Sequence, residues 1–237
     1  MNDEIAILMA AGLGTRMKPI TNIIPKPLVK VKNTPLIETI IDSLLKRQIK
    51  HIYIVVGYKK EKFYYLQEKY TNISFIENVE YDKKNNISSL KAVGNILGSS
   101  DCFICESDLF VNDDSIFKSQ FETSCYFGKT PSSDISEWGF IVNNNRIVQI
   151  KFDCENNFDM LGISYWKKKD AEIIRKSINE AYKTTGHEKL YWDEIVNLNL
   201  DTIYATINLL DNTKVFEIDS CKDLIEVNTF LKLKKNS

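Results

Sequence analysis

The chain has 237 residues, of which 43% are hydrophobic and 27% charged, and its formal net charge is -1. These values are typical of a soluble globular protein with room for one large core or two modest ones. They exclude the strong positive field of proteins that bind nucleic acid or an anionic membrane surface, so we expect neither partner.

The first residues do not resemble a targeting signal. The opening MNDE is acidic where a signal peptide would be basic, and the apolar run from Ile5 to Ala11 is too short to cross a bilayer. The five cysteines are odd in number and irregularly spaced, which argues against a disulfide framework. We therefore expect a cytoplasmic protein without membrane insertion.

Strand-like and helix-like segments alternate through the first half of the chain. The short continuous apolar run from Ile5 to Met9 is typical of a strand covered on both faces. A threonine followed by proline at residues 34 and 35 predicts an N-cap and the first helical position. The predicted strands are Ile5–Met9, His51–Val56, Ile73–Glu77 and Asp101–Cys105. The predicted helices are Thr34–Gln48, Lys60–Tyr70 and Ile87–Leu97, the last weakened by Gly94.

The second half is more mixed, with short strands separated by turns rich in Asn, Asp and Ser. The segment VNNNRIV predicts a hairpin at Asn143–Asn145. The predicted strands are Ser124–Gly128, Gly139–Val142, Ile147–Phe152, Leu161–Tyr165, Ile203–Ile207 and Val215–Glu217. The predicted helices are Asp170–Lys183 and Ser220–Leu233.

Strand–helix–strand units of this length predict an α/β fold with a mostly parallel, Rossmann-like mixed sheet flanked by helices. No linker or internal repeat divides the chain, so we expect a single domain over residues 1–237. The later strands should form a lid, a small β-rich insertion over the sheet. Cys102 and Cys105 have the spacing of half a zinc site, but in a strand they would point to opposite faces, so we predict a packed core strand.

The turn after the first strand carries unusual chemistry, Gly12-Leu13-Gly14-Thr15-Arg16. It lacks the third glycine of a Rossmann fingerprint and the spacing of a P-loop. Ten residues after Arg16, Lys26 lies between two prolines that fix its backbone. Backbone N–H groups, a guanidinium and an ammonium suit a triphosphate and a second phosphorylated substrate.

Two aspartates follow strands: Asp108 lies beyond the strand ending at Cys105, and Asp219 lies beyond Val215–Glu217. The carboxyl ends of strands are where an α/β sheet places its site, and carboxylate oxygens are the ligands that Mg²⁺ prefers. For Asp219 the alternative is a helix N-cap, because DSCKDLIE begins a helix. For the two together we favour a magnesium site, with Glu106 and Glu217 as weaker candidates beside it.

The stretch AAGLGTRMKPITNIIPKPLVKVKNTPLIE resembles the N-terminal signature of nucleotidyltransferases that make nucleotide-activated sugars and alcohols, the sugar-nucleotide pyrophosphorylase-like superfamily. The whole chain is similar to bacterial phosphocholine cytidylyltransferases, through YDKKNNISSL, SEWGF, GISYW, KLYWDEIV and FEIDS. The resemblance implies the nucleotide-diphospho-sugar transferase-like fold. Residues 1–122 would form the nucleotide-binding half, and residues 123–237 the acceptor-binding and metal-completing half.

The resemblance also implies an activity, the condensation of CTP with phosphocholine to CDP-choline and pyrophosphate by Mg²⁺-assisted in-line transfer. In this enzyme Arg16 and Lys26 would be catalytic, and Asp108 and Asp219 would bind the metal. The implied nucleotide-binding residues are Ala10, Ala11, Gly12, Gly14, Thr15, Arg16, Asn85 and Ser89. The resemblance leaves a monomer or a small homo-oligomer open.

The implied acceptor-binding residues are Trp138, Tyr191, Trp192 and Asp193. A quaternary ammonium has no N–H donor, so aromatic faces recognise it, although each aromatic taken alone could equally pack in a core. The chain departs from similar members at Ile87 and Ser88, where they carry aromatic residues, and ESDL resembles cytidylyltransferases that activate aminoalkylphosphonates.

The acceptor therefore stays open among phosphocholine, 2-aminoethylphosphonate, phosphoethanolamine and other small zwitterionic phosphates. An ammonium with N–H donors would prefer carboxylates such as Glu137, Asp193 and Glu194. A sugar 1-phosphate is disfavoured, because NNISS stands where hexose-phosphate members carry a small-residue loop. A non-catalytic nucleotide-binding module is disfavoured because the charged residues of the predicted site are all present.

Overall fold

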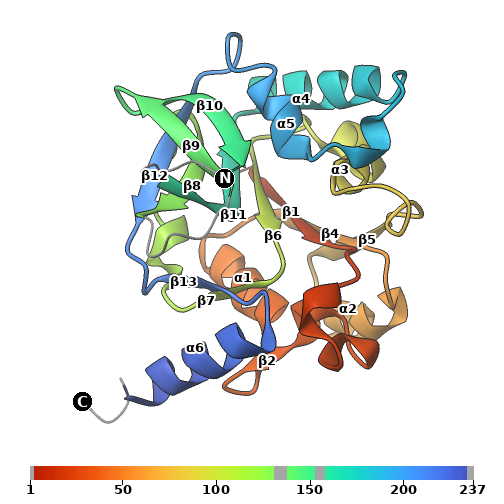
Figure 1. Cartoon of the computed structure of the whole chain (residues 1–237), viewed down its shortest axis with the longest axis vertical. Coiled ribbons are helices and arrows are strands. Elements are labelled where there is room, and N and C mark those ends of the chain that lie inside the picture. Colours follow the sequence, from red (N-terminus) through yellow and green to blue (C-terminus); the bar gives the residue numbers. More distant parts are fainter. Residues whose placement is uncertain (1–2, 131–137, 153–157, 234–237) are drawn as a thin grey trace.

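The computed structural model describes residues 3–130, 138–152 and 158–233. In these ranges a nine-stranded mixed sheet has the order β5-β4-β1-β6-β11-β8-β12-β10-β9 (Figure 1). Its first four strands pair in parallel, as the alternation of strands and helices predicts. These strands are β1 (Ile5–Ala10), β4 (His51–Val56), β5 (Ile73–Glu77) and β6 (Cys102–Glu106). The predicted α/β fold class is confirmed.

The strands of the second half extend this sheet rather than covering it, so the expectation of a lid over the sheet is wrong. Strand β11 continues it by pairing antiparallel with β6, and β9 pairs with both β10 and β11. The predicted hairpin turn is present, with Asn144 and Asn145 at positive φ. These strands are β8 (Ser124–Lys129), β9 (Trp138–Asn143), β10 (Arg146–Phe152), β11 (Phe158–Trp166) and β12 (Ala205–Leu210).

Helices cover both faces of the parallel part of the sheet (Figure 1). Because side chains alternate along a strand, Leu8 of β1 packs with α1 (Leu36–Lys46) and α2 (Tyr65–Lys69), whereas Ile7 packs with the helices of the other face. Those helices are α3 (Ile87–Val93), α4 (Lys168–Ala181) and α5 (Trp192–Asn197). Cys102 and Cys105 are buried in opposite cores, which confirms the packed core strand.

The start of α1 differs from the prediction. Strands β2 (Lys30–Val31) and β3 (Thr34–Pro35) form a small antiparallel pair, joined through Lys32 and Asn33 at positive φ. This tight turn holds Thr34 in the ladder, and Pro35 takes the N-cap position without a side-chain cap. The prediction of Thr34 as the N-cap is therefore wrong.

Other boundaries move by a few residues. The segment predicted as one helix over 60–70 divides into a 3-10 helix and α2. Helix α3 ends at Val93 and is followed by Gly94, where φ is 60°. Strand β12 begins two residues later than predicted. No helix within the described ranges combines the length and apolar character needed to span a membrane. The short 3-10 helices are Thr15–Met17, Ile20–Asn22, Lys26–Leu28, Lys60–Phe63, Gly94–Ile96, Asp114–Phe117 and His187–Lys189.

A separate two-stranded ladder lies beside the sheet. Strand β7 (Leu109–Val111), which the sequence analysis did not predict, pairs antiparallel with β13 (Val215–Glu217), and the final helix α6 (Cys221–Leu233) follows. The backbone N–H of Ile218 donates to the carbonyl oxygen of Asp108 at 3.1 Å. This ladder brings the residue before β7 next to the residues that follow β13.

A buried ion pair fastens α1 to the start of the sheet. Arg47, at the end of α1, donates from Nε and a terminal nitrogen to the two oxygens of Glu4 at 2.7 and 2.9 Å. Both side chains are less than 10% exposed. An exposed pair between Lys50 and Asp3 lies nearby in the sequence and provides a matched comparison.

We expect Arg47→Leu to lower the free energy of unfolding by about 3–5 kcal/mol, because it removes the guanidinium from a buried carboxylate. Lys50→Ala should cost no more than about 1 kcal/mol, since its ion pair is exposed. Urea denaturation of both variants measures the difference, and equal losses would contradict the structural importance of the buried pair.

Candidate active site

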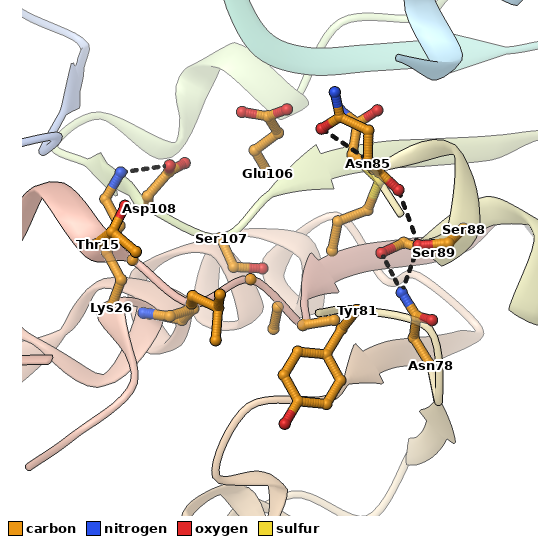
Figure 2. A pocket seen from close by; sticks show the side chains of 18 of the residues that line it. Thr15, Lys26, Asn78, Tyr81, Asn85, Ser88, Ser89, Glu106, Ser107 and Asp108 are labelled. Carbon is orange, nitrogen blue, oxygen red and sulfur yellow. Dashed lines mark hydrogen bonds and ion pairs between the residues drawn. The ribbon is translucent and has the colours of Figure 1, made fainter. Parts of the chain in front are cut away.

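A cavity of about 410 Å³ opens where β1 and β6 end (Figure 2). Its lining comes from the loop after β1, the start of α3, the end of β6 and the segment before α6. The structure thus gathers at one cavity all the residues predicted for nucleotide, catalysis and metal: Ala10, Ala11, Gly12, Gly14, Thr15, Arg16, Lys26, Asn85, Ser89, Asp108 and Asp219. Their individual roles remain predictions.

The loop after β1 packs tightly against the segment of Lys26. Gly14 has a φ of 61°, and a Cβ added there would lie 2.9 Å from the Cβ of Lys26 and 3.0 Å from a methyl carbon of Thr21. The Thr21 hydroxyl also donates to the Gly14 carbonyl oxygen at 2.9 Å. At Gly12, by contrast, a Cβ would meet no atom within 4 Å. Gly14 is therefore required by the backbone and by packing, whereas Gly12 borders the open cavity.

Lys26 lies at the centre of the charged end of the cavity. Its Nζ contacts Oδ2 of Asp108 at 2.7 Å and Oδ1 of Asp219 at 2.5 Å, and its side chain is only 10% exposed. Burial alone would lower the pKa of Lys26, but attraction to the two carboxylates outweighs burial and raises it well above its ordinary value. The ammonium therefore remains charged and fixed in position.

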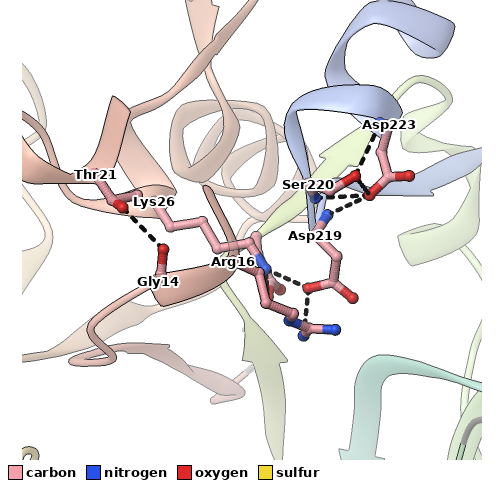
Figure 3. Close-up of polar contacts among 8 residues, drawn as sticks. Gly14, Arg16, Thr21, Lys26, Asp219, Ser220 and Asp223 are labelled. Carbon is pink, nitrogen blue, oxygen red and sulfur yellow. Dashed lines mark hydrogen bonds and ion pairs between the residues drawn. The ribbon is translucent and has the colours of Figure 1, made fainter. Parts of the chain in front are cut away.

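The carboxylate of Asp219 does not cap α6. Ser220 precedes the helix, and Oδ2 of Asp223 accepts from the backbone N–H groups of Asp219 and Ser220 at 3.0 and 2.7 Å (Figure 3). The Asp219 side chain instead contacts Lys26 and a terminal nitrogen of Arg16, the latter at 2.7 Å. The alternative that Asp219 is an N-cap is excluded, and its carboxylate faces the cavity.

Three carboxylates near Lys26 form an arrangement that fits a hard cation. One oxygen each of Glu106, Asp108 and Glu217 lies within 4.8 Å of the others. Oδ1 of Asp108 is buried and has no hydrogen-bond partner among the described residues. Burial and repulsion from Asp108 and Glu217 raise the pKa of Glu106 well above its ordinary value, so a bound cation would relieve this repulsion. Glu106 and Glu217 thus join one of the two predicted aspartates, Asp108, whereas the Asp219 carboxylate contacts Lys26 and Arg16.

The other end of the cavity contains residues that the sequence analysis missed. Asn78 donates from Nδ2 to the hydroxyls of Ser88 and Ser89 at 2.9 and 3.2 Å (Figure 2). The Tyr81 ring also lines the cavity, and a Cβ at Gly57 would lie 2.7 Å from it. Gly57 directly follows β4. A glycine at this position was the feature of the sequence that could have indicated a side chain packed against the backbone there.

Asn85 is held by a neighbouring loop. Its Nδ2 donates to the carbonyl oxygen of Lys189 at 3.1 Å, and its Oδ1 accepts from the backbone N–H of Asn86 at 3.2 Å. Both polar atoms of the amide already have protein partners. Its predicted contact with the base therefore stays a prediction, and Ser89 has fewer competing contacts.

The predicted acceptor residues separate into two pairs. The rings of Trp138 and Tyr191 lie 5.4 Å apart, and Tyr191 is 38% exposed. Trp192, by contrast, is only 3% exposed and stacks on Tyr126 at 5.8 Å. Trp166 is fully buried. Tyr191 is exposed and Trp138 is partly buried, whereas Trp192 belongs to the core in this structure.

Asp193 is buried with Trp192. Its Oδ1 accepts from the Tyr126 hydroxyl at 2.9 Å. Burial raises the pKa of Asp193 to about 7, although the Tyr126 hydrogen bond favours the ionised form. Both residues border a second cavity of about 10 Å³, which shares Met9 and Glu106 with the large one.

The other carboxylates considered for the acceptor have different positions. Glu194 accepts from the backbone N–H of Tyr191 at 2.7 Å, which is a contact at the start of α5. Glu137 lies outside the described residues.

Comparison with known proteins identifies the family of this chain. Residues 5–151 match the family model described as nucleotidyl transferase. The chain belongs to the nucleotidyl transferase family. The match spans the loop after β1, Lys26 and Asp108, which are the residues gathered at the large cavity.

Individual relatives are similar over almost the whole chain. A 2-aminoethylphosphonate cytidylyltransferase from Lancefieldella rimae is 42% identical, with 92% of this chain and 89% of the relative covered. A choline-phosphate cytidylyltransferase from Streptococcus pneumoniae is 36% identical, with 96% and 98% covered. A solved structure of CTP:phosphocholine cytidylyltransferase from Streptococcus pneumoniae has a TM-score of 0.90 at 33% identity, with 97% and 99% covered. The resemblance to cytidylyltransferases is confirmed.

The raised pKa of Asp193 generates a prediction about stability. The ordinary pKa of an aspartate is 3.8, and that of Asp193 in the folded chain is about 7. Between these two pH values the folded chain keeps a proton on Asp193 that the unfolded chain has lost. The stability contributed by this group therefore falls as the pH rises through that window. Asp193→Asn keeps an oxygen acceptor for Tyr126 and does not titrate. We expect the free energy of unfolding of the wild type to decrease, relative to this variant, by about 2 kcal/mol from pH 5 to pH 7, because the slope of about 1.4 kcal/mol per pH unit halves as the pH reaches the folded pKa.

Urea denaturation at the two pH values measures this difference. A constant difference between the two proteins would show that Asp193 has an ordinary pKa.

Proposed function

We propose that the chain catalyses CTP-dependent cytidylyl transfer onto a small phosphate or phosphonate that carries an ammonium group. The observation that carries this proposal is the buried ammonium of Lys26, held between Asp108 and Asp219 beside the glycine loop of a large cavity. The cytidylyltransferase relatives support the choice of CTP.

In the proposed reaction an oxygen of the acceptor attacks the α-phosphorus of CTP. A new phosphorus–oxygen bond forms, the bond from the α-phosphorus to the bridging oxygen breaks, and pyrophosphate leaves. Both substrates are anionic, so alignment and charge neutralisation dominate the barrier. Lys26 lies where it would stabilise charge around the attacked phosphorus. Arg16, whose side chain is 72% exposed, is free to turn from Asp219 toward the departing pyrophosphate.

A divalent cation, for which we propose Mg²⁺, fits the carboxylates described above. Asp108 would hold it together with Glu106 and Glu217, and Asp219, which now contacts Lys26 and Arg16, would complete the site. When bound, the cation would neutralise phosphate charge. Asp108 has a buried oxygen without a protein partner, so it can bind a cation while its other oxygen contacts Lys26.

Pyrophosphate release tests the reaction. CTP, UTP and dTTP would each be offered with phosphocholine, phosphoethanolamine, 2-aminoethylphosphonate and glucose 1-phosphate. We expect release with CTP and an ammonium-bearing acceptor, loss of activity in EDTA and recovery with Mg²⁺. Lys26→Ala should reduce kcat/KM by about 10²–10³-fold, as for other groups that stabilise transition-state charge.

The exposed Lys50→Ala variant is the matched control and should retain wild-type activity. The proposal fails if CTP yields no pyrophosphate with any ammonium-bearing acceptor. Wild-type turnover by Lys26→Ala would remove Lys26 from the mechanism.

Phosphocholine is the first candidate acceptor. The rings of Trp138 and Tyr191 can face a trimethylammonium group, which offers methyl groups and diffuse charge but no N–H donor. The similarity to choline-phosphate cytidylyltransferases supports this candidate.

2-Aminoethylphosphonate is the second candidate, and a different observation favours it. Glu106 lines the large cavity and also the second cavity, which Trp192 and Asp193 border. A primary ammonium could donate to this carboxylate, whereas a trimethylammonium could not. Trp192, which would complete an aromatic cage, is buried. The relative from Lancefieldella rimae supports this candidate.

Two variants separate the acceptors. Tyr191→Ala should raise KM for phosphocholine about 10-fold more than KM for 2-aminoethylphosphonate, since only the first depends on an aromatic face. Glu106→Gln should do the reverse. The ratio of kcat/KM values for the two acceptors is the measurement, because it cancels general damage to the site. An unchanged ratio in both variants would exclude both residues from acceptor selection.

A further inference from the structure

Two adjacent asparagines, Asn85 and Asn86, lie at the end of the large cavity that Asn78 and Ser89 also line. They join this end of the cavity to the segment that precedes α5. The backbone N–H of Asn85 donates to the carbonyl oxygen of Glu188 at 2.8 Å, and its side chain donates to Lys189. Oδ1 of Asn86 accepts from the backbone N–H of Trp192 at 3.0 Å, across 106 positions of sequence. Asn85 and Asn86 both line the large cavity.

The contact made by Asn86 supports the start of a helix. Trp192 is the first residue of α5, and the first N–H groups of a helix have no partner within it. Asn86 therefore acts as a cap supplied from another part of the chain. Glu194 satisfies the preceding N–H, that of Tyr191. Together these two side chains fix the direction in which the chain enters α5.

The same loops are joined at a second point. The Tyr182 hydroxyl donates to Glu80 at 3.0 Å, and the ammonium of Lys84 lies 4.3 Å from the centre of the Tyr182 ring. The segment that carries Asn85 and Asn86 is thus also fastened to the chain at the end of α4. Of these contacts, that of Asn86 reaches the stretch from Tyr191 to Asp193, which contains three of the four predicted acceptor residues.

We propose that Asn86 is a positioning residue that couples the two substrate sites, so that a bound cytidine triphosphate increases the affinity for the acceptor. The inference rests on the proposed function. A nucleotide in the cavity restricts the segment that carries Asn86, and the hydrogen bond to Trp192 transmits this restriction to the start of α5. Because coupling free energies are reciprocal, the acceptor increases nucleotide affinity by the same factor.

Three variants test the role of this hydrogen bond. Asn86→Ala removes the acceptor atom, whereas Asn86→Asp keeps an oxygen at the helix start, where an aspartate is favourable. Asn197→Ala is the matched control, because Oδ1 of Asn197 also accepts from a backbone N–H, that of Ile150 at 2.7 Å, but at the other end of α5. Asn197 does not line the large cavity.

The measurement is calorimetric titration of each protein, in MgCl₂, with phosphocholine and with 2-aminoethylphosphonate separately. Each titration is done with and without a CTP analogue that has a methylene group between the α- and β-phosphorus atoms and cannot be turned over. In the wild type we expect saturating analogue to lower the acceptor Kd about 10-fold, within the range usual for coupled sites. The factor should fall below about 2-fold in Asn86→Ala and remain in Asn86→Asp and Asn197→Ala.

Three results would overturn the inference: no coupling in the wild type, unchanged coupling in Asn86→Ala, or an equal loss of coupling in Asn197→Ala. The last would assign the effect to the stability of α5. These outcomes are distinct from failure of the proposed function, which pyrophosphate release tests independently. A wild type that binds neither acceptor with the analogue present would contradict both.

Discussion

The site is organised around one ammonium group. Lys26 contacts Asp108 and Asp219, which are far apart in the sequence, and each enters the site from a different element. The antiparallel ladder of β7 and β13 makes this convergence possible, because it places the end of β6 next to the start of α6. Burial favours the neutral amine of Lys26, and attraction to the two carboxylates outweighs it and keeps the pKa raised. The ladder, the lysine and the two aspartates therefore depend on one another.

Local patterns predicted the parallel half of the sheet well. Strands β4 and β5 have the predicted bounds, since apolar and β-branched residues bounded by turn residues indicate strands in sequence. Pairings between distant segments left no such signature. Strand β7 is three residues long and is stabilised by β13, and Thr34 lies in the short strand β3 rather than at a helix cap. The strands after β8 could be predicted individually, but not their places in the central sheet.

Some residues of the cavity could likewise be predicted from sequence, and others could not. The loop after β1 and Lys26 were predictable because a resemblance with several fixed spacings identified them, and the structure gathers them at one cavity. Trp192 shows the limit of this reasoning, because residue type and spacing cannot tell an aromatic that faces a ligand from one that packs in a core. Asn78 was missed because it belongs to no recognisable motif. Tyr81 begins the segment YDKKNNISSL, but only Gly57 indicated its close approach to the backbone at the cavity.

The double pairing of β9 has a consequence for association with other chains. Because β9 pairs with both β10 and β11, the strands at that end of the sheet form a closed ring, whereas β5 at the other end pairs only with β4. An unpaired strand edge is a template for unwanted addition of another chain, and a closed ring removes that template. In the described part of the chain, the end of the sheet that carries Trp138 is thus protected from edge-to-edge aggregation. Trp138 itself pairs with Phe152 of β10, and the next residue, Gly139, pairs with both β10 and β11.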